Sequence, residues 1–401
     1  MGQKLQGLLI RKRRQEREWS QAALCNGICA VSYLSKIEQG KVESSPEVLD
    51  LLFRRLDIQW QDDPAFCREA AAWFEEYYDR LFSGEDLQDM TQELLSRETV
   101  YRNSPFFLDW LLLSWAATGQ VQEEVEEFVS AMDARQQNLH LCLKGQFQDL
   151  LRIAERSYFF LQAGKHAYWR GDYSYAVACF FQGAERAARE GSLPVMMLCH
   201  LFLGNCYSTL NQLDQTLEHY EAARRMARSL GRRVTLVEIA YNQATTELQM
   251  GLTQEALRHL LEHPWNEALY FHKLAICYER LGQEKLARVA KETEDMEEWY
   301  RITLHRLIDI CRMEAPLGDL PCDPPQAREI FEQMCGLVRF RLDHKGYLQE
   351  PEYGKALHSC VRSMEQQFSI GFVRFHVPWL EEWYAANRQY RQAYELVRKF
   401  S

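Results

Sequence analysis

Apolar residues recur at helical spacing along almost the whole chain. The pattern is carried first by Val48, Leu51, Leu52 and Leu56, and then by Phe66, Ala70, Trp73, Phe74, Tyr77, Tyr78 and Leu81. Residues spaced by three and four positions lie on one face of an α-helix, so each run predicts a helix with one buried side. Only 11 Pro and 20 Gly interrupt the 401 residues, which favours long helices. We therefore predict an all-α protein.

The first 62 residues predict a cluster of short helices. Ser20 can cap a helix over 21–25, because a Ser side chain accepts a backbone N–H at a helix start. The Asn26-Gly27 pair predicts a tight turn, and a third helix is expected over about 31–39. Ser45 and the Pro that follows it begin a fourth helix. Short helices with a tight turn between the second and third form a helix-turn-helix, a DNA-binding arrangement.

The motifs of this region resemble the phage-repressor (Xre/Cro) class of DNA-binding domains. The matching segments are residues 10–14, 19–24 and 33–41. The resemblance implies that Arg14 pairs with Glu38 inside the domain, that Gln21 contacts phosphate, and that the third helix faces the major groove. The predicted DNA-binding residues are Arg14, Gln21, Val31, Ser32, Tyr33, Ser35 and Lys36. Two alternatives stay open. In the first, Lys36 is only an ordinary solvated charge. In the second, residues 1–62, which we call the head, form a degenerate domain that no longer binds DNA.

Residues 63–150 predict a helical connector with a degenerate repeat. Asp63 begins a helix, Gly84 ends it, and a second apolar helix is expected over 106–117. The acidic run at 122–127 is expected to be solvated. No Gly/Ser-rich linker separates the head from the remaining residues, which we call the body. A movement of the body could therefore change the orientation of the head.

Residues 151–295 contain an internal repeat. A small residue is followed twelve positions later by Ala or Thr, and a larger side chain follows four positions after that. The four sets are Gly164/Ala176/Phe180, Gly204/Thr216/Tyr220, Ala244/Ala256/Leu260 and Ala275/Ala287/Lys291. This pattern resembles the tetratricopeptide repeat, which implies a right-handed superhelix of paired helices. Residues 296–401 are expected to add degenerate C-terminal helical repeats and a cap.

In such a superhelix the first helix of each pair lines a concave wall that binds extended peptides. The template places on this wall Lys165, Tyr168, Trp169, Asn205, Ser208, Tyr241, Thr245, Gln249, His272 and Glu279, and also Asn242 if its repeat is shifted by one residue. An Asn side chain can donate to and accept from one peptide unit, so Asn205 is the main candidate for a ligand contact. The alternative is that Asn205 is only a solvated helical residue.

Charge and cysteine content separate the head from the body and indicate a reducing compartment. The chain carries a net charge of −10, yet residues 1–60 hold ten basic and seven acidic residues, so we expect only the head to meet nucleic acid. The 12 Cys are scattered without CxxC pairs, which indicates free thiols rather than a disulfide framework. No apolar stretch approaches the roughly 18 residues of a membrane span. We expect a cytoplasmic protein without a membrane partner.

No catalytic, cofactor or metal site is predicted. His259 and His263 have a spacing that can hold a metal, but no acidic motif accompanies them and Pro264 ends their helix, so we expect both to be exposed. The sequence contains neither a Gly-rich phosphate loop nor a nucleophile elbow. We therefore predict that the protein is not an enzyme.

A repressor-type head followed by a tetratricopeptide-like array resembles the peptide-responsive regulators of Gram-positive bacteria, the RRNPP group that includes Rgg, PlcR, PrgX and NprR. The resemblance implies a homodimeric transcription factor of quorum sensing that binds a double-stranded DNA operator and responds to a short signalling peptide. An alternative of another class is an interaction protein whose array sequesters or inhibits a protein partner, as the related Rap proteins do.

Overall fold

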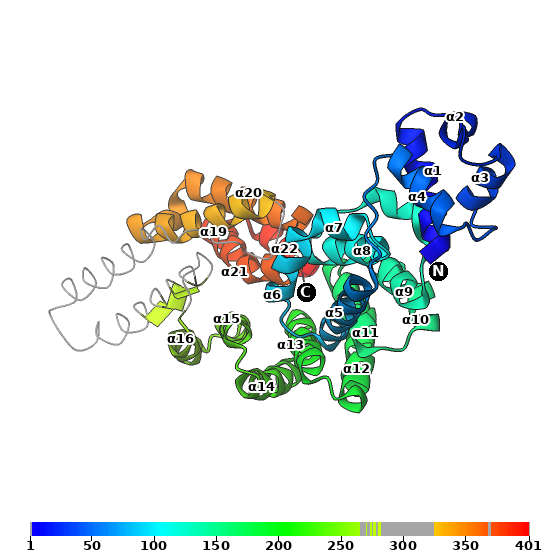
Figure 1. Ribbon diagram of the computed structural model, residues 1–401. Coiled ribbons are helices and arrows are strands. Elements are labelled where there is room, and N and C mark those ends of the chain that lie inside the picture. The colour runs from blue at the N-terminus through cyan, green and yellow to red at the C-terminus, as the bar shows by residue number, and fades with distance from the viewer. Residues whose placement is uncertain are drawn as a thin grey trace. The chain divides into compact units, whose positions relative to one another are not determined.

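The computed structural model describes residues 2–264, 270, 273, 274, 276, 277, 280, 281, 325–367 and 370–400. Every regular element among them is a helix, as the apolar spacing predicts (Figure 1). The chain divides into two compact units, which are residues 1–163 with 185–195 and residues 164–184 with 196–401. The finer division at residues 62, 150 and 295 stays a prediction.

The first unit begins with the four short helices of the head, drawn in blue in Figure 1. They are α1 (Gly2–Glu16), α2 (Gln21–Cys25), α3 (Val31–Glu38) and α4 (Pro46–Arg55). The connector follows with α5 (Pro64–Ser83), α6 (Gln88–Ser96), α7 (Glu98–Arg102), α8 (Phe107–Thr118), the 3-10 helix η1 (Glu123–Ala131), α9 (Ala134–Leu143) and α10 (Phe147–Ile153).

Local sequence sets the ends of these helices. Ser20 Oγ accepts the N–H of Ala23 at 3.1 Å, and Ser45 Oγ accepts the N–H of Val48 at 3.4 Å. The left-handed backbone at Gly84 ends α5. These positions agree with the predicted caps and stops, because a cap needs only neighbouring residues to form. α3 starts where expected and ends one residue before the predicted limit.

A buried ion pair ties α1 to α3 inside the head. The guanidinium of Arg14 donates to both carboxylate oxygens of Glu38, at 2.6 and 2.9 Å, and to the carbonyl of Trp19 at 2.7 Å. The Glu38 side chain is 3% exposed, and its hydrogen bond raises the pKa of Arg14. The two helices also pass very close together, since a Cβ on Gly7 would lie 2.0 Å from the Ile37 carbonyl oxygen. The pairing is the one that the family resemblance implies.

The acidic run at 122–127 is largely solvated, as predicted, because Glu123, Glu126 and Glu127 are exposed, but Glu124 is partly covered. Lys12 of α1 lies 2.9 Å from Glu127 and 3.5 Å from Glu124, whose side chain is 18% exposed. Arg102 of α7 also pairs with Glu124. Glu126 lies 3.1 Å from His140 of α9 and 2.9 Å from Lys144, the residue after that helix. Glu124 is covered because cations from α1 and α7 converge on η1, a fact that a local charge pattern does not contain.

The second unit is built of helices that follow each other in antiparallel pairs. They are α11 (Ser157–Trp169), α12 (Tyr173–Glu190), α13 (Leu193–Thr209), α14 (Leu213–Ser229), α15 (Arg233–Gln249) and α16 (Thr253–Glu262), and the first residues of α11 and α13 and the last of α12 belong to the first unit. Further along the chain come α19 (Pro325–Asp343), η2 (Tyr347–Gln349), α20 (Pro351–Gln367), α21 (Ile370–Ala386) and α22 (Tyr390–Phe400).

The predicted small residues lie where paired helices cross. A Cβ on Gly164 would lie 2.5 Å from the Phe180 ring, and one on Gly204 would lie 2.4 Å from the Tyr220 ring. Ala244 and Leu260, the corresponding pair of the third set, are both buried. The fourth set, Ala275/Ala287/Lys291, lies outside the described residues. The structure therefore supports the first three repeats and is consistent with a tetratricopeptide-like array.

The C-terminal helices share one apolar core with the third repeat. This core contains Tyr241, Leu260, Met334, Tyr353, Leu357, Val361 and Trp379 among others. The sequence missed a close crossing in this region, where a Cβ on Gly354 would lie 2.2 Å from the Trp383 ring. α21 and α22 therefore pack on the array as part of the second unit.

The contact of Lys12 with η1 yields the first prediction. Lys12→Ala should lower the free energy of unfolding by about 0.5–1 kcal/mol, because it removes a half-buried cation shared by two carboxylates. Amide hydrogen exchange over 123–131 should become faster in the full-length protein. The matched control is Arg11→Ala, which removes the exposed neighbouring charge. Equal exchange in the two variants would show that Lys12 does not hold η1.

Candidate DNA-binding and ligand-binding sites

The outer face of α3 carries the predicted base-contacting residues. Leu34, Ile37 and Glu38 are buried, so the opposite face is turned to solvent. Val31, Ser32 and Lys36 are exposed there, and Tyr33 and Ser35 are half-buried. Tyr33 Oη donates to the Glu43 carbonyl at 3.4 Å, and Ser35 Oγ accepts from the side chain of Gln39 at 3.1 Å. The face can enter a major groove, and its contacts with DNA stay predictions.

Two other predicted DNA-binding residues are already engaged inside the head. Gln21 Nε2 donates to Glu38 Oε2 at 2.8 Å, and Arg14 pairs with the same carboxylate. Glu38 therefore organises α1, α2 and α3 together. A phosphate contact by Gln21 would use its remaining amide hydrogen, because one hydrogen is committed to Glu38.

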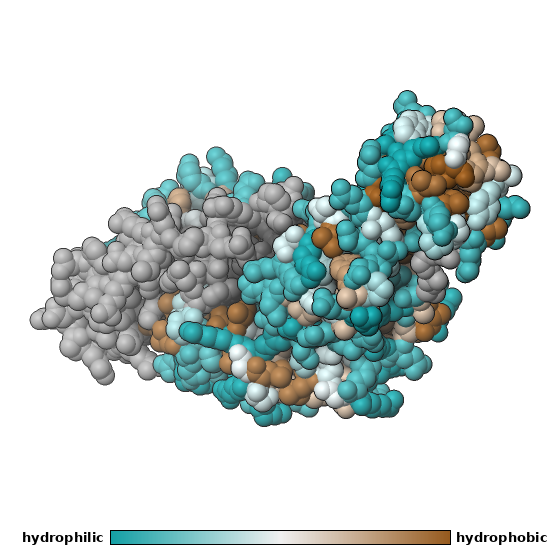
Figure 2. Space-filling model, in the orientation of Figure 1, coloured by the Kyte–Doolittle hydropathy of each residue, from teal (hydrophilic) through white to brown (hydrophobic). Residues whose placement is uncertain are grey.

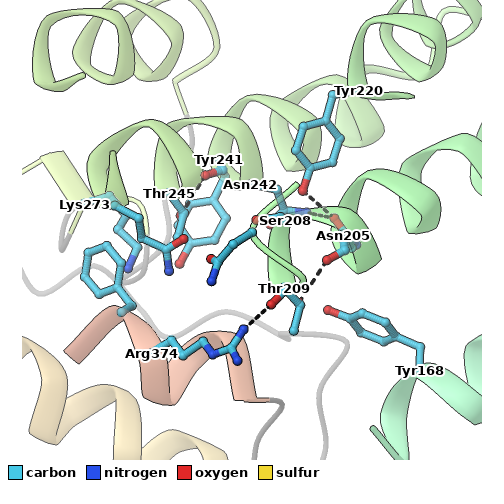
Figure 3. Close-up of a pocket in the computed structure, with 13 residues that line it drawn as sticks. Tyr168, Asn205, Ser208, Thr209, Tyr220, Tyr241, Asn242, Thr245, Lys273 and Arg374 are labelled. Atoms are coloured by element: carbon cyan, nitrogen blue, oxygen red, sulfur yellow. Dashed lines mark hydrogen bonds between the residues drawn. The ribbon is translucent and has the colours of Figure 1, made fainter. Parts of the chain in front are cut away.

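A pocket that is partly open to solvent lies within the second unit (Figure 3), and most of the residues that line it have polar side chains. Tyr168 of α11, Asn205 and Ser208 of α13, and Tyr241, Asn242, Thr245 and Gln249 of α15 line it. These residues come from the first helices of three consecutive repeats, as predicted for a concave wall. Thr209, Asn211, Tyr220, Lys273, Arg374 and Phe375 complete the described lining.

Two of the residues predicted for the concave wall are not among the described lining residues of the pocket, and two others lie outside the described residues. Lys165 is not among the described lining residues, and its Nζ lies 5.6 Å from the centre of the Phe202 ring. The Trp169 side chain is exposed. His272 and Glu279 lie outside the described residues. A role in ligand binding stays a prediction for each predicted residue.

A hydrogen-bond network fixes the amide of Asn205. Its Oδ1 accepts from Tyr220 Oη at 2.8 Å and from Asn242 Nδ2 at 3.1 Å (Figure 3). Ser208 and Thr246 are joined across the same two helices at 2.7 Å. Tyr220 is 1% exposed, and burial raises its pKa well above the ordinary value. Asn205 is therefore a partner of a buried hydroxyl rather than only a solvated residue.

The network divides hydrogen-bonding capacity between two amides. Both lone pairs of Asn205 Oδ1 are used, so Nδ2 is the group it can offer to a ligand. Asn242 has committed one Nδ2 hydrogen and retains Oδ1 as an acceptor. A donor and an acceptor thus come from neighbouring helices rather than from Asn205 alone.

The prediction that His259 is exposed was wrong. His259 is 8% exposed, and its Nδ1 lies 2.9 Å from Glu247 Oε2. Glu247 is itself buried and also accepts from Gln243 at 2.9 Å. The histidine is buried because α16 packs on α15, which brings a partner carboxylate from twelve residues away. Spacing within one helix could not reveal that partner.

Cys206 and Cys277 are both buried free cysteines. Burial raises the pKa of the Cys206 and Cys277 thiols to about 12, so both stay protonated at neutral pH. Within the described ranges no cluster of His, Cys, Asp and Glu could hold a metal ion. None of the described helices has the length and hydropathy to cross a membrane, and the visible described surface in Figure 2 is mostly hydrophilic.

The shared hydrogen bond of Asn205 and Tyr220 yields a second prediction. Asn205→Ala should lower the free energy of unfolding by about 1–3 kcal/mol, because a buried hydroxyl loses an acceptor. Adding Tyr220→Phe should recover part of that loss, since the unsatisfied hydroxyl is then absent. Urea denaturation of the single and double variants measures this coupling, with Gln249→Ala at the exposed edge of the pocket as control. Additive losses would mean that the bond contributes nothing to stability.

Comparison with known proteins agrees with this geometry. Residues 10–62 match the family Helix-turn-helix. The chain is 24% identical over 296 residues to the transcriptional activator NprA of Geobacillus stearothermophilus, an alignment that covers 64% of this chain and 68% of that protein. No solved structure matches the chain. Residues 10–62 are therefore an Xre-type helix-turn-helix domain, and the chain that carries it is a DNA-binding transcriptional regulator similar to those of the RRNPP group.

Proposed function

We propose that a short signalling peptide, bound in the pocket of the second unit, controls DNA binding by a homodimer of this chain in the cytoplasm. The observation that carries the proposal is the lining of the pocket by amides and hydroxyls from three consecutive first helices. An extended peptide presents alternating donors and acceptors along its length, which suits a row of such groups. Asn205 Nδ2 and Asn242 Oδ1 supply one donor and one acceptor side by side.

Dimerisation is proposed because helix-turn-helix regulators of this kind bind two half-sites about one helical turn apart. One head presents a single short α3 and so covers one half-site. Two heads joined through their bodies would read an operator with twofold symmetry.

The DNA contacts of α3 yield a third prediction. With an operator selected from random DNA by the full-length protein, Tyr33→Ala should weaken binding by about 1–3 kcal/mol and relax one base position. Lys36→Ala should weaken binding to all sequences alike and lower the slope of log affinity against log salt by about one, as expected for one phosphate contact. Gel-shift titration over a range of salt concentrations measures both effects.

The control for these variants is Arg152→Ala, which removes an exposed cation of α10. It should leave affinity, base preference and salt slope unchanged. If Tyr33→Ala and Lys36→Ala behaved like this control, α3 would not be the recognition helix.

The pocket and the dimer yield a fourth prediction, tested by native mass spectrometry of full-length protein purified from cells that make it naturally. The main species should have about twice the 47.3 kDa mass of one chain, plus a bound mass of a few amino-acid residues. Asn242→Ala should lose the bound mass, because an acceptor for the peptide backbone is removed. Gln215→Ala, at an exposed position of α14, should retain it.

Other masses would decide against the proposal. A bound protein domain would favour the sequestration alternative. Empty protein from dense cultures would contradict control by a peptide, and a single-chain mass at working concentration would contradict the dimer.

A further inference from the structure

The wall formed by the first helices continues beyond the pocket on α15. Tyr241 and Asn242 of this helix line the pocket (Figure 3), and Glu238 precedes them by three and four positions. Residues with these spacings are neighbours on one face of an α-helix. Glu238 therefore lies on the same wall, one helical turn from Asn242, and its side chain is half-buried there.

Side chains of α11 and α13 extend the same wall. The Phe202 ring of α13 lies roughly perpendicular to the ring of Tyr168, a pocket residue, with 5.7 Å between the ring centres. Lys165 of α11 places its Nζ 5.6 Å from the centre of the Phe202 ring. Lys165, Phe202 and Glu238 thus come from the first helices of three consecutive repeats, as the pocket residues do.

The carboxylate of Glu238 is partly desolvated. Burial raises its pKa above the ordinary value, because a carboxylate is less stable where few water molecules surround it, and the positive charge of Lys165 opposes this shift. Glu238 also contributes, after burial and Tyr168, to the raised pKa of Tyr220. The Tyr220 hydroxyl donates to Asn205, so the carboxylate acts electrostatically on the network that orients the pocket amides.

Compensation for this desolvation is incomplete within the described part of the chain. The attraction of Lys165 is the one favourable interaction that acts on the Glu238 carboxylate there, and it crosses from the first repeat to the third. A desolvated carboxylate without a hydrogen bond is unfavourable, so a donor that reaches Glu238 from the side of the pocket stabilises it. A positively charged donor does so most strongly, because its hydrogen bonds to a carboxylate are charge-assisted.

We propose that the occupant of the pocket carries a positively charged nitrogen, which donates hydrogen bonds to the carboxylate of Glu238 one helical turn beyond Asn242. This inference rests on the proposed peptide function and names the chemistry of the ligand. The nitrogen belongs either to the N-terminus of the peptide or to a Lys or Arg side chain. One turn of α15 is about 5.4 Å long, which one or two extended residues or one long side chain can span from a peptide unit held by Asn205 and Asn242.

The experiment offers the full-length protein four pools of random short synthetic peptides. The pools have free or acetylated N-termini, each with and without Lys and Arg, and retained peptides are identified by mass spectrometry. An N-terminal ammonium group predicts retention from both free pools and none from the acetylated pools. A side-chain cation predicts retention only from the pools that contain Lys and Arg, whether acetylated or free.

Glu238→Gln, which keeps the size of the side chain and removes its charge, should weaken binding of the best retained peptide about ten- to a hundredfold, the usual loss for a charge-assisted bond. Isothermal titration calorimetry measures this loss, and circular dichroism establishes that each variant is folded. Glu255→Gln, which removes an exposed carboxylate of α16, is the matched control and should bind normally.

The same peptide with its cation neutralised separates recognition from a merely structural role of Glu238. The cation is removed by acetylation of the N-terminus or by replacement of the Lys or Arg with Met. The wild type and Glu238→Gln should bind this neutral peptide equally, because the carboxylate then has no charge to recognise. A structural role would weaken binding of both peptides alike.

The outcomes separate the two claims. If the wild type retains peptides from the acetylated pool that lacks Lys and Arg as well as from the others, the inference of a cation is wrong while the peptide function stands. If only cationic peptides are retained but Glu238→Gln binds them like the wild type, the assignment to Glu238 is wrong. If the wild type retains no peptide from any pool, the proposed function fails and the inference fails with it.

Discussion

The helix pairs α11–α12 and α13–α14 can lie against each other only because one helix of each pair lacks a side chain at the crossing. Gly164 lies beneath the Phe180 ring and Gly204 beneath the Tyr220 ring, where even one added carbon would overlap the aromatic atoms. Close-packed interiors have no room to absorb such an overlap, so these glycines set the spacing of each pair. A third close crossing of this kind occurs where Gly354 lies beneath the Trp383 ring.

The geometry of the pocket follows from that spacing. Tyr220 fills the crossing at Gly204, and its hydroxyl reaches Asn205, the residue next to that glycine. Asn242 arrives from the following first helix and donates to the same oxygen. One residue therefore serves both the packing of the helices and the geometry of the pocket, because the ring that fixes the helix spacing also fixes the orientation of the amide. A pocket whose amides are already oriented loses less entropy when it orders a ligand.

Charged side chains join segments in both units. In the first unit, Glu38 gathers Arg14 and Gln21, and Lys12 connects α1 with η1. In the second unit, Arg374 connects the end of α13 with the end of α22. Buried charges need partners, so each of these contacts fixes the position of an element that apolar packing alone would leave less defined.

The sequence by itself determined the features that depend on neighbours or on a regular period. Ser20 and Ser45 cap their helices because capping uses residues two or three positions away, and the apolar spacing identified the faces that become buried. The small residues of the repeat predicted the crossings at Gly164 and Gly204, and with them most of the pocket lining on α11, α13 and α15. The Arg14–Glu38 pair came from resemblance to a known family rather than from periodicity.

Only the tertiary structure decided which distant element covers each face. It buried His259 against Glu247, covered Glu124 of η1 with Lys12 and Arg102, and brought Lys273 and Arg374 to the pocket. Periodicity shows that a helix has an inner face but does not say what that face meets. Partners such as Thr209 and Arg374, which are 165 residues apart, are selected by the packing of the whole array rather than by any local pattern.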